Sequence, residues 1–294
     1  MKAKSILLLT GGLLLAVVVL VAALLIPVRK ASDPEEQTTK VTTDIEETTQ
    51  EETPMVETKG ESMPTKPTIS TITFPSTDGV PITADLYWTG DKTAPFILLF
   101  HQARYSRGEY MEIAPKLNAL GYNCLAIDQR SGDQVNGIKN ETNRAAKAAN
   151  RSTEYVDAYL DLEATLAYVQ KQYAPDRLIV WGSSYSSSLV LILASAHPNE
   201  IDAVLSFSPG EYFKFDGHLI ADYAKKITQP VFITSAKSEE KSWLGIADQI
   251  TAKGSVFFVP KGSGMHGSST LLESTTNNAE YWTAVESFLA SLGE

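Results

Sequence analysis

The chain has 294 residues, of which 43% are hydrophobic, enough for one sizeable core. Its formal net charge is −10 and it carries no basic cluster large enough for a nucleic-acid surface, so nucleic acid is not an expected partner. The single cysteine, Cys124, excludes an internal disulfide and any site built on clustered cysteines.

The first notable segment is an uncharged apolar run over residues 6–28, with two lysines before it and Arg29-Lys30 after it. About 20 apolar residues cross a bilayer, so the run predicts a transmembrane signal anchor over residues 1–30, with the lipid bilayer as its partner. A cleaved signal peptide is the alternative, but its apolar run is usually shorter and ends in small residues. The flanking positive charges are nearly balanced, so they leave the orientation open.

Residues 31–67 are rich in threonine and glutamate, with 10 acidic residues against three lysines and no aromatic residue. Such a segment buries too little apolar surface to offset the entropy lost on ordering. It predicts a disordered acidic linker between the anchor and a domain over residues 68–294. An acidic stalk behind a short amino-terminal segment is most simply an exported one, so we expect this domain to be extracytoplasmic.

From about Ile69 onward, apolar runs alternate with amphipathic stretches. Residues 69–88 hold two alternating runs joined at Asp78-Gly79, which predicts a β-hairpin. Strands are then predicted at 95–100, 122–128, 177–181, 201–208, 230–236 and 255–260, and helices at 106–121, 154–172, 184–196, between the last two strands, and at 277–292. The alternation predicts a mostly parallel sheet with helices on both faces and an antiparallel leading hairpin.

Two local features of this stretch bear on the argument. The helix at 106–121 is predicted to open with a capping box, in which Ser106 and Glu109 satisfy the first backbone N–H groups. The segment 129–152 is polar and predicts an irregular loop. Ligands of such sheets bind beyond the carboxyl ends of the strands, so the residues after each strand are the candidates for chemistry.

The sequence Gly182-Ser183-Ser184-Tyr185-Ser186 follows the strand at 177–181 and matches the pattern G-x-S-x-G except at its last residue. The pattern requires small residues because a sharp strand-to-helix turn brings the two backbones together. Ser184 is the candidate nucleophile in this register, whereas a register centred on Ser183 would put Trp181 in place of the first glycine. A plain serine-rich helix start, with Ser183 or Ser184 as the N-cap, is the alternative.

A histidine-led loop, His101-Gln102-Ala103-Arg104, directly follows the strand at 95–100. Together with the serine turn two strands later, it resembles the α/β-hydrolase fold, and most closely the small lidless esterases of the dienelactone-hydrolase type, over about residues 70–290. The resemblance implies a three-layer sandwich. It also implies an oxyanion hole formed by the backbone N–H of Tyr185 and one N–H of this loop, Ala103 first and Gln102 next. His101 is expected to shape the loop and not to act as a base.

The resemblance also implies a carboxylate after the strand at 230–236, because the histidine of a catalytic triad must be oriented by an acid. Glu239 falls where the family usually carries its aspartate, so it is the candidate acid. Glu240 is adjacent, and Glu211 follows the preceding strand. Both remain open as reserve acids.

The chain has only four histidines. His266, in KGSGMHGSS after the last strand, is flanked by glycines, which indicates a loop that must bring it close to another segment. The resemblance places the general base of the family here. His197 ends a helix and His218 lies in a variable stretch, so neither fits this role.

These residues predict a serine hydrolase in which Ser184 attacks a carbonyl, His266 takes its proton and Glu239 orients His266. The expected partner is a small-molecule ester or a related acyl substrate, cleaved through an acyl-enzyme. The sequence has no HExxH and no dinucleotide fingerprint, so neither a metal nor an organic cofactor is expected. A peptidase or thioesterase would use the same triad. A membrane-tethered, non-catalytic binding module is the other alternative, because fold does not imply function.

Overall fold

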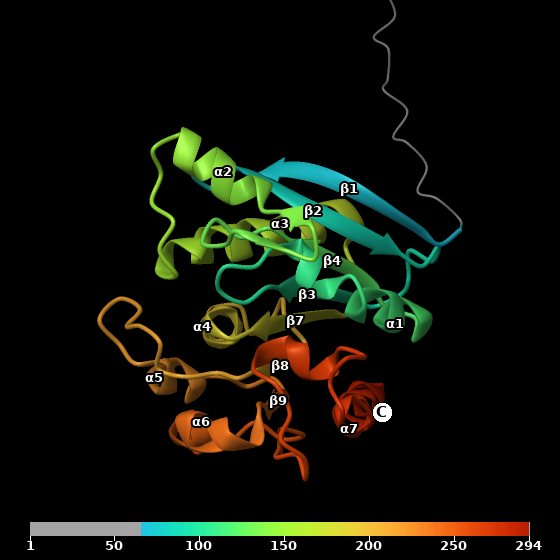
Figure 1. Ribbon diagram of the computed structural model, residues 1–294, viewed down its shortest axis with the longest axis vertical. Coiled ribbons are helices and arrows are strands. Elements are labelled where there is room, and N and C mark those ends of the chain that lie inside the picture. Colours follow the sequence, from blue (N-terminus) through green and yellow to red (C-terminus); the bar gives the residue numbers. More distant parts are fainter. Residues whose placement is uncertain (1–65, 294) are drawn as a thin grey trace, which may run out of the picture. The chain divides into compact units, whose positions relative to one another are not determined.

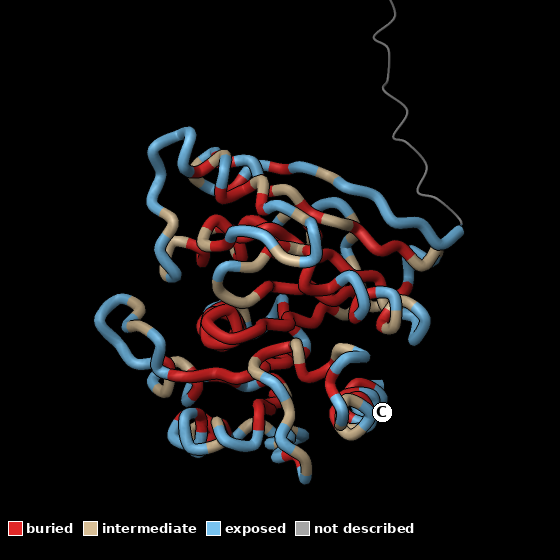
Figure 2. Tube along the Cα trace, viewed as in Figure 1, coloured by how far each residue is buried: buried red, intermediate tan, exposed pale blue. Residues whose placement is uncertain are grey.

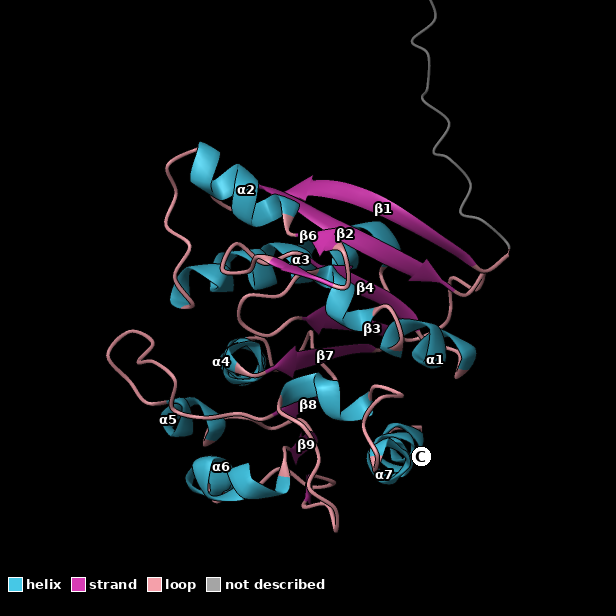
Figure 3. Cartoon of the chain, viewed as in Figure 1, coloured by secondary structure: helices cyan, strands magenta, loops and turns pink. Residues whose placement is uncertain are grey.

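An eight-stranded, mostly parallel sheet with helices on both faces organises the molecule (Figures 1 and 3). The computed structural model of the protein describes residues 66–293. In sheet order the strands are β1 (Thr68–Pro75), β2 (Pro81–Trp88), β4 (Asn123–Ile127), β3 (Phe96–Phe100), β7 (Leu178–Ser183), β8 (Ala203–Phe207), β9 (Val231–Thr234) and β10 (Val256–Phe258). Only β2 runs against the others in this sheet. The predicted α/β architecture and its leading hairpin are confirmed.

The helices cover the two faces of the sheet separately. Within the described chain they are α1 (Ile113–Ala119), α2 (Glu141–Ala148), α3 (Tyr159–Tyr173), α4 (Tyr185–Ala196), α5 (Ile220–Ala224), α6 (Glu240–Ala247) and α7 (Asn278–Ser291). The helices α3, α4, α5 and α6 contribute to one hydrophobic core, and α1 and α7 to another. Each core packs against one face of the sheet, so the three-layer arrangement follows from burial on both sides.

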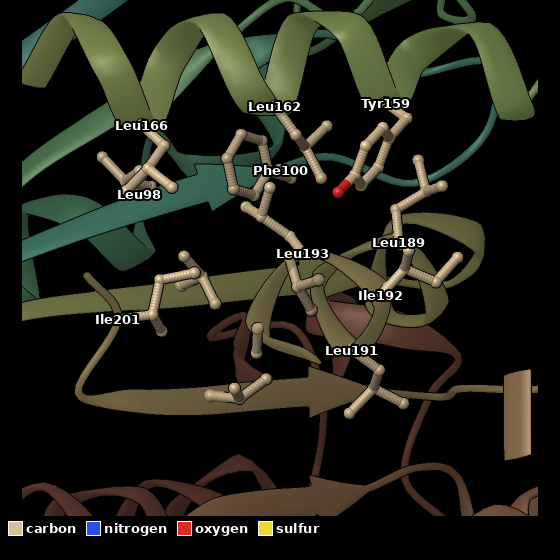
Figure 4. Packing of buried hydrophobic residues seen from close by; sticks show 14 of the residues in the cluster. Leu98, Phe100, Tyr159, Leu162, Leu166, Leu189, Leu191, Ile192, Leu193 and Ile201 are labelled. Carbon is tan, nitrogen blue, oxygen red and sulfur yellow. The ribbon is translucent and has the colours of Figure 1, made fainter. Parts of the chain in front are cut away.

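The central strands feed both cores because successive side chains of a strand point to opposite faces. In β3, Leu98 and Phe100 belong to the core under α3 and α4, whereas Ile97 and Leu99 belong to the core under α1 and α7. Figure 4 shows Leu162 of α3 approaching this first group from above, with side chains of α4 below. Figure 2 shows the result as a buried band through the central strands, with β1 exposed along most of its length. The central strands are buried on both faces and mostly apolar, which made them easy to predict.

The predicted helix at 106–121 is wrong, because the segment divides into a 3-10 turn, η1 (Arg107–Tyr110), and α1. Pro115 explains the break. In one continuous helix its ring would clash with the carbonyl of Met111 and remove a hydrogen bond, whereas in α1 it lies in the first turn, where no N–H is needed. Ser106 caps η1 by accepting a hydrogen bond from the N–H of Gly108. The side chain of Glu109 takes no part in that cap, because its carboxylate bonds Gln102 and Ser183.

The predicted irregular loop at 129–152 is also wrong, because it contains the short hairpin β5 (Gln134–Val135) and β6 (Ile138–Lys139), followed by α2. Asn140 caps α2 by accepting a hydrogen bond from the N–H of Asn143 at 2.7 Å. The buried face of α2 is polar as well as apolar, since Thr142 accepts a hydrogen bond from the N–H of Thr83 in β2 at 2.9 Å. The sequence of α2, ETNRAAKA, is mostly polar, and its buried face holds no large apolar side chain that would have indicated a buried helix.

The predicted membrane anchor over residues 1–30 lies outside the described residues, as does nearly all of the linker predicted over residues 31–67. Between residues 66 and 293 no helix is long and apolar enough to cross a bilayer. The longest helix of this region, α3, has 15 residues and is therefore about 22 Å long, against a hydrocarbon core of about 30 Å. The predicted membrane localisation is corrected accordingly: the described chain offers no spanning element, and the extracytoplasmic placement that rested on one loses its support.

Candidate active site

Ser184 lies on a sharp turn between β7 and α4, at the carboxyl edge of the sheet. Its backbone has φ 58° and ψ −124°, a conformation that non-glycine residues rarely adopt. The turn is possible because residue 182 is a glycine: a Cβ at this position would clash with the backbone of Ser186 and Ser187. The N–H of Ser184 donates to the carbonyl of Phe207 at the end of β8, 2.8 Å away. Ser184 is therefore held in its strained conformation by β7, which it directly follows, and by the hydrogen bond to the end of β8.

His266 approaches Ser184 from the loop after β10. Its Nε2 lies 2.7 Å from the Oγ of Ser184. The loop can come this close because of Gly267, which has φ 62° and whose Cβ would clash with the hydroxyl of Ser183. Glycine next to the histidine is thus required both by backbone conformation and by space.

Glu239 completes a continuous chain of hydrogen bonds. It ends the 3-10 turn η3 (Lys237–Glu239) after β9, and its Oε1 lies 2.6 Å from Nδ1 of His266. The other oxygen, Oε2, accepts a hydrogen bond from the hydroxyl of Ser208 at 2.7 Å. The structure therefore brings together the three residues that the sequence proposed as nucleophile, base and acid.

The two reserve acids do not reach the histidine. Glu211 instead accepts hydrogen bonds from the N–H groups of Ile220 and Ala221 at 2.6 and 2.9 Å, at the start of α5. Glu240 begins α6 and has no hydrogen bond to His266 among residues 66–293.

Ser208 is a site residue that the sequence did not reveal. It lies just beyond β8 with φ 57°, and its side chain is buried. While donating to Glu239, its hydroxyl also accepts the N–H of Gly267 at 2.8 Å, so it joins the acid to the loop of the base. Its position at a strand end was the one available signal, but the strand predicted at 201–208 included Ser208 as its last residue, so it was not considered as a residue beyond the strand.

Glu239 and His266 shift each other's pKa. Burial alone would raise the pKa of Glu239, but the hydrogen bonds from His266 and Ser208 outweigh it and hold that pKa below its ordinary value. The hydrogen bond to Glu239 raises the pKa of His266, against a smaller opposing effect of burial. Glu239 is therefore ionised at neutral pH, as an orienting carboxylate must be.

Two backbone N–H groups are available beside Ser184. Tyr185 is the first residue of α4, so its N–H has no acceptor within the helix. In the histidine-led loop, the N–H of Gln102 already donates to Oε2 of Glu109 at 2.7 Å. The N–H of Ala103 makes no hydrogen bond within residues 66–293, so of the two proposed loop donors Ala103 is the free one.

Comparisons with known proteins agree with the fold. A family model described as alpha/beta hydrolase fold matches residues 95–238. A search of curated proteins found no match. Among solved structures, the Pyrococcus furiosus esterase Pf2001 is similar with a TM-score of 0.58 and 18% identity over 76% of this chain and 93% of that one. Dienelactone hydrolase from Anabaena variabilis is similar with a TM-score of 0.59 and 15% identity, over 76% and 98% of the two chains. Est1E from Butyrivibrio proteoclasticus, in a structure with bound ferulic acid, has a TM-score of 0.59 and 14% identity, over 75% and 98%.

The chain is an α/β-hydrolase by fold. Its departure from the usual serine turn, Ser186 in place of glycine, is accommodated by hydrogen bonds. The hydroxyl of Ser186 donates to the carbonyl of His101 at 2.5 Å and accepts the side-chain N–H of Gln129 at 2.7 Å. The larger side chain thus ties the turn to the ends of β3 and β4.

His101 has a structural role in this fold. Its Nε2 accepts the N–H of Gln129 at 2.9 Å, so Nδ1 carries the proton and donates to the carbonyl of Gln102 at 2.8 Å. Burial lowers the pKa of His101 to about 4, which keeps it neutral. His197 pairs with Glu200 at 2.8 Å. Residues 66–293 contain no group of three or more His, Cys, Asp or Glu side chains that could hold a metal ion.

A cavity of about 310 Å³ lies between the start of α3 and the segment before α5. Its walls are mostly apolar, with charged residues among them: Val156, Asp157, Tyr159, Leu160, Lys214, Phe215 and Asp216. Tyr155, next to one wall, stacks its ring on that of Tyr185 with the centroids 4.5 Å apart. Tyr212, near the other wall, donates its hydroxyl to the carbonyl of Ser208 and lies beside Ser184. Along the chain, each wall is thus next to a tyrosine: Tyr212 lies beside Ser184 itself, and Tyr155 contacts the residue after it.

Proposed function

We propose that the protein is a serine hydrolase that cleaves a carboxylic ester, or a related acyl bond, of a small molecule. One observation carries the proposal: the hydroxyl of Ser184, both ring nitrogens of His266 and the carboxylate of Glu239 lie in one hydrogen-bonded chain, with contacts of 2.7 and 2.6 Å. The names of the structural neighbours, which include esterases and dienelactone hydrolases, support an ester as the substrate class.

In the first half of the reaction, Oγ of Ser184 attacks the substrate carbonyl carbon while its proton passes to Nε2 of His266. The oxygen of the tetrahedral intermediate becomes negative and accepts hydrogen bonds from the N–H groups of Tyr185 and Ala103. One such donor is worth about 10²- to 10³-fold in kcat. The carbon–oxygen bond to the alcohol then breaks, and the alcohol leaves with the proton from His266. The acyl group stays on Ser184.

In the second half, water attacks the acyl carbon and gives one proton to Nε2 of His266. The second tetrahedral intermediate breaks its bond to Ser184, which recovers the proton from the histidine, and the carboxylic acid departs. Glu239 keeps the proton of the neutral imidazole on Nδ1, so that Nε2 is free to act as a base, and it stabilises the imidazolium formed in each half.

The cavity between the start of α3 and residues 214–216 is the proposed site for the part of the substrate remote from the scissile bond. Tyr159, Leu160 and Phe215 line it, which favours an apolar or aromatic group. Asp157 and Lys214, also in its lining, can meet a polar end of that group.

Hydrolysis of a panel of short-chain esters, thioesters and aminoacyl amides tests the proposal. We expect ester turnover that falls by at least about 10⁴-fold in Ser184→Ala, because the covalent step is lost. Ser195→Ala is the matched control: Ser195 lies on α4, the helix that follows Ser184, and among residues 66–293 its hydroxyl bonds only the carbonyl of Ile192. Full turnover by Ser184→Ala would contradict the nucleophile. Failure of the folded protein to cleave any member of the panel would favour a non-catalytic binding module, and a preference for thioesters or amides would change the reaction class.

A further inference from the structure

Glu109 is a buried carboxylate that the reaction described above does not use. It belongs to η1 and only 2% of its surface is exposed. Among residues 66–293, no lysine or arginine forms an ion pair with it. A buried carboxylate without a cationic partner is costly to maintain, so its surroundings must compensate for the lost hydration.

Three hydrogen-bond donors surround this carboxylate. The backbone N–H of Gln102 donates to Oε2 at 2.7 Å, and the side-chain amide of Gln102 lies 3.3 Å from Oε1. The hydroxyl of Ser183 donates to Oε1 at 2.8 Å. An ionised carboxylate only accepts hydrogen bonds, so this set of donors fits the charged form of Glu109.

The three donors connect Glu109, directly or through Ser183, to three segments of the candidate site. Gln102 directly precedes Ala103, the free loop donor, and Ser183 directly precedes Ser184. The hydroxyl of Ser183 in turn accepts the N–H of Ser268 at 2.9 Å, two residues after His266. One carboxylate therefore links the oxyanion loop, the serine turn and the loop of the base.

We propose that Glu109 is a positioning residue, whose carboxylate holds the loop of Gln102 and Ala103 against the serine turn and the loop of His266. It touches neither substrate nor reacting atoms, and it acts by fixing the spacing between Ser184 and the N–H of Ala103. The catalytic meaning of this inference rests on the proposed hydrolase function, but the link between the three segments does not.

The charge of Glu109 gives the proposal a second consequence. Burial raises the pKa of Glu109 to about 7. Its negative charge helps to raise the pKa of His266, together with the larger effect of Glu239. The titratable groups that interact with Glu109 are His266, from the loop after β10, and Tyr110, its neighbour in η1. Removing the charge should therefore lower the pKa of His266.

Glu109→Gln tests both consequences, because it keeps the shape and one acceptor but removes the charge. The matched control is Glu112→Gln, the same change at an exposed glutamate three residues along the chain. The first measurement is the rate of covalent labelling by a fluorophosphonate, followed against pH. The second is the titration of His266 by NMR, which needs no activity.

We expect Glu109→Gln to label at least about tenfold more slowly than the wild type on the high-pH plateau, since small displacements of catalytic groups carry large losses. We also expect its His266 to titrate at lower pH, while Glu112→Gln matches the wild type in both. Labelling within twofold of the control together with an unmoved titration would overturn the proposal. Because the NMR titration is independent of labelling, it tests Glu109 even if the wild type does not react, a result that would count against the hydrolase function itself.

Ser183→Ala distinguishes the effect of the hydrogen bond between Glu109 and the serine turn from the effect of the charge of Glu109. It also tests the proposal if Glu109→Gln does not fold. It removes the bond between Glu109 and the serine turn but leaves the carboxylate in place. We expect slower labelling, with the pKa of His266 lowered less than in Glu109→Gln, because the carboxylate is still present. Labelling at the wild-type rate in this variant would refute the link.

Discussion

Ser208→Ala is the substitution whose effect can be worked out most fully from the structure. It removes the hydrogen bond of 2.7 Å to Glu239 and leaves the N–H of Gly267 without its acceptor at 2.8 Å. The backbone strain at φ 57° is the same for alanine as for serine, so only the hydroxyl is tested. Glu239 then keeps its contact with His266 but loses the second group that fixes it.

A hydrogen bond to a charged group contributes about 1.5–3 kcal/mol. If all of that energy is expressed in the transition state, kcat falls by about 10- to 150-fold, since each 1.36 kcal/mol is about a factor of ten. We expect a loss of kcat within this range and a smaller change in KM, because the hydroxyl does not contact the substrate.

Steady-state hydrolysis of the preferred ester checks this expectation, with Ser206→Ala as the control. Ser206 lies in β8, two residues before Ser208, and is also buried, but its hydroxyl donates to a neutral carbonyl, that of Ser187, at 3.1 Å. Both variants should lose stability, and only Ser208→Ala should lose kcat. If the two variants have kcat values within twofold of each other, Ser208 does not act through Glu239.

Three further results are expected. The acid limb of kcat/KM should have its midpoint above 6.5, the ordinary value for histidine, because the raised pKa of His266 keeps it protonated to higher pH; a midpoint below 6.5 would contradict the link to Glu239. Gly267→Ala should abolish turnover, since its Cβ would clash with the hydroxyl of Ser183 and its φ of 62° disfavours alanine; near-normal kcat would contradict the close approach. The folded-state pKa of Glu109 is raised from 4.5 to about 7, so as the pH rises Glu109 loses its proton earlier in the unfolded chain than in the folded protein. The free energy of unfolding of the wild type, relative to that of Glu109→Gln, should therefore fall by up to about 3 kcal/mol between these two pH values. Parallel stability curves for the two proteins would refute the buried charge.

The strands of the eight-stranded sheet and the order of the site residues could be predicted from the sequence because both are local signals. Each central strand is mostly apolar, and the serine, the candidate acid and the histidine each follow an apolar run. The glycines were equally informative: Gly182 and Gly267 stand where a Cβ would clash.

The supporting contacts could not be predicted, because they join residues far apart in the chain. Glu109 matched a capping box with Ser106, yet its carboxylate lies on Ser183, 74 residues away. Ser208 meets Glu239 over 31 residues and Gly267 over 59. The local sequence pattern predicted Ser106 as the partner of Glu109, but in the folded protein the buried carboxylate bonds Ser183 instead.

The helix α2 was missed for a related reason. Its buried face carries Thr142 and Asn143, which dock by hydrogen bonds and not by apolar contact. In the helix predicted at 106–121, the amphipathic pattern persisted across the break that Pro115 imposes, so periodicity alone gave one helix where the chain forms two elements.

The measurement that tests the central claim most directly is the location of the fluorophosphonate adduct by mass spectrometry of the digested protein. The geometry around Ser184 predicts one adduct per chain, on the peptide that contains Ser184, and no adduct in Ser184→Ala. An adduct on another residue, or equal labelling of Ser184→Ala, would contradict Ser184 as the nucleophile.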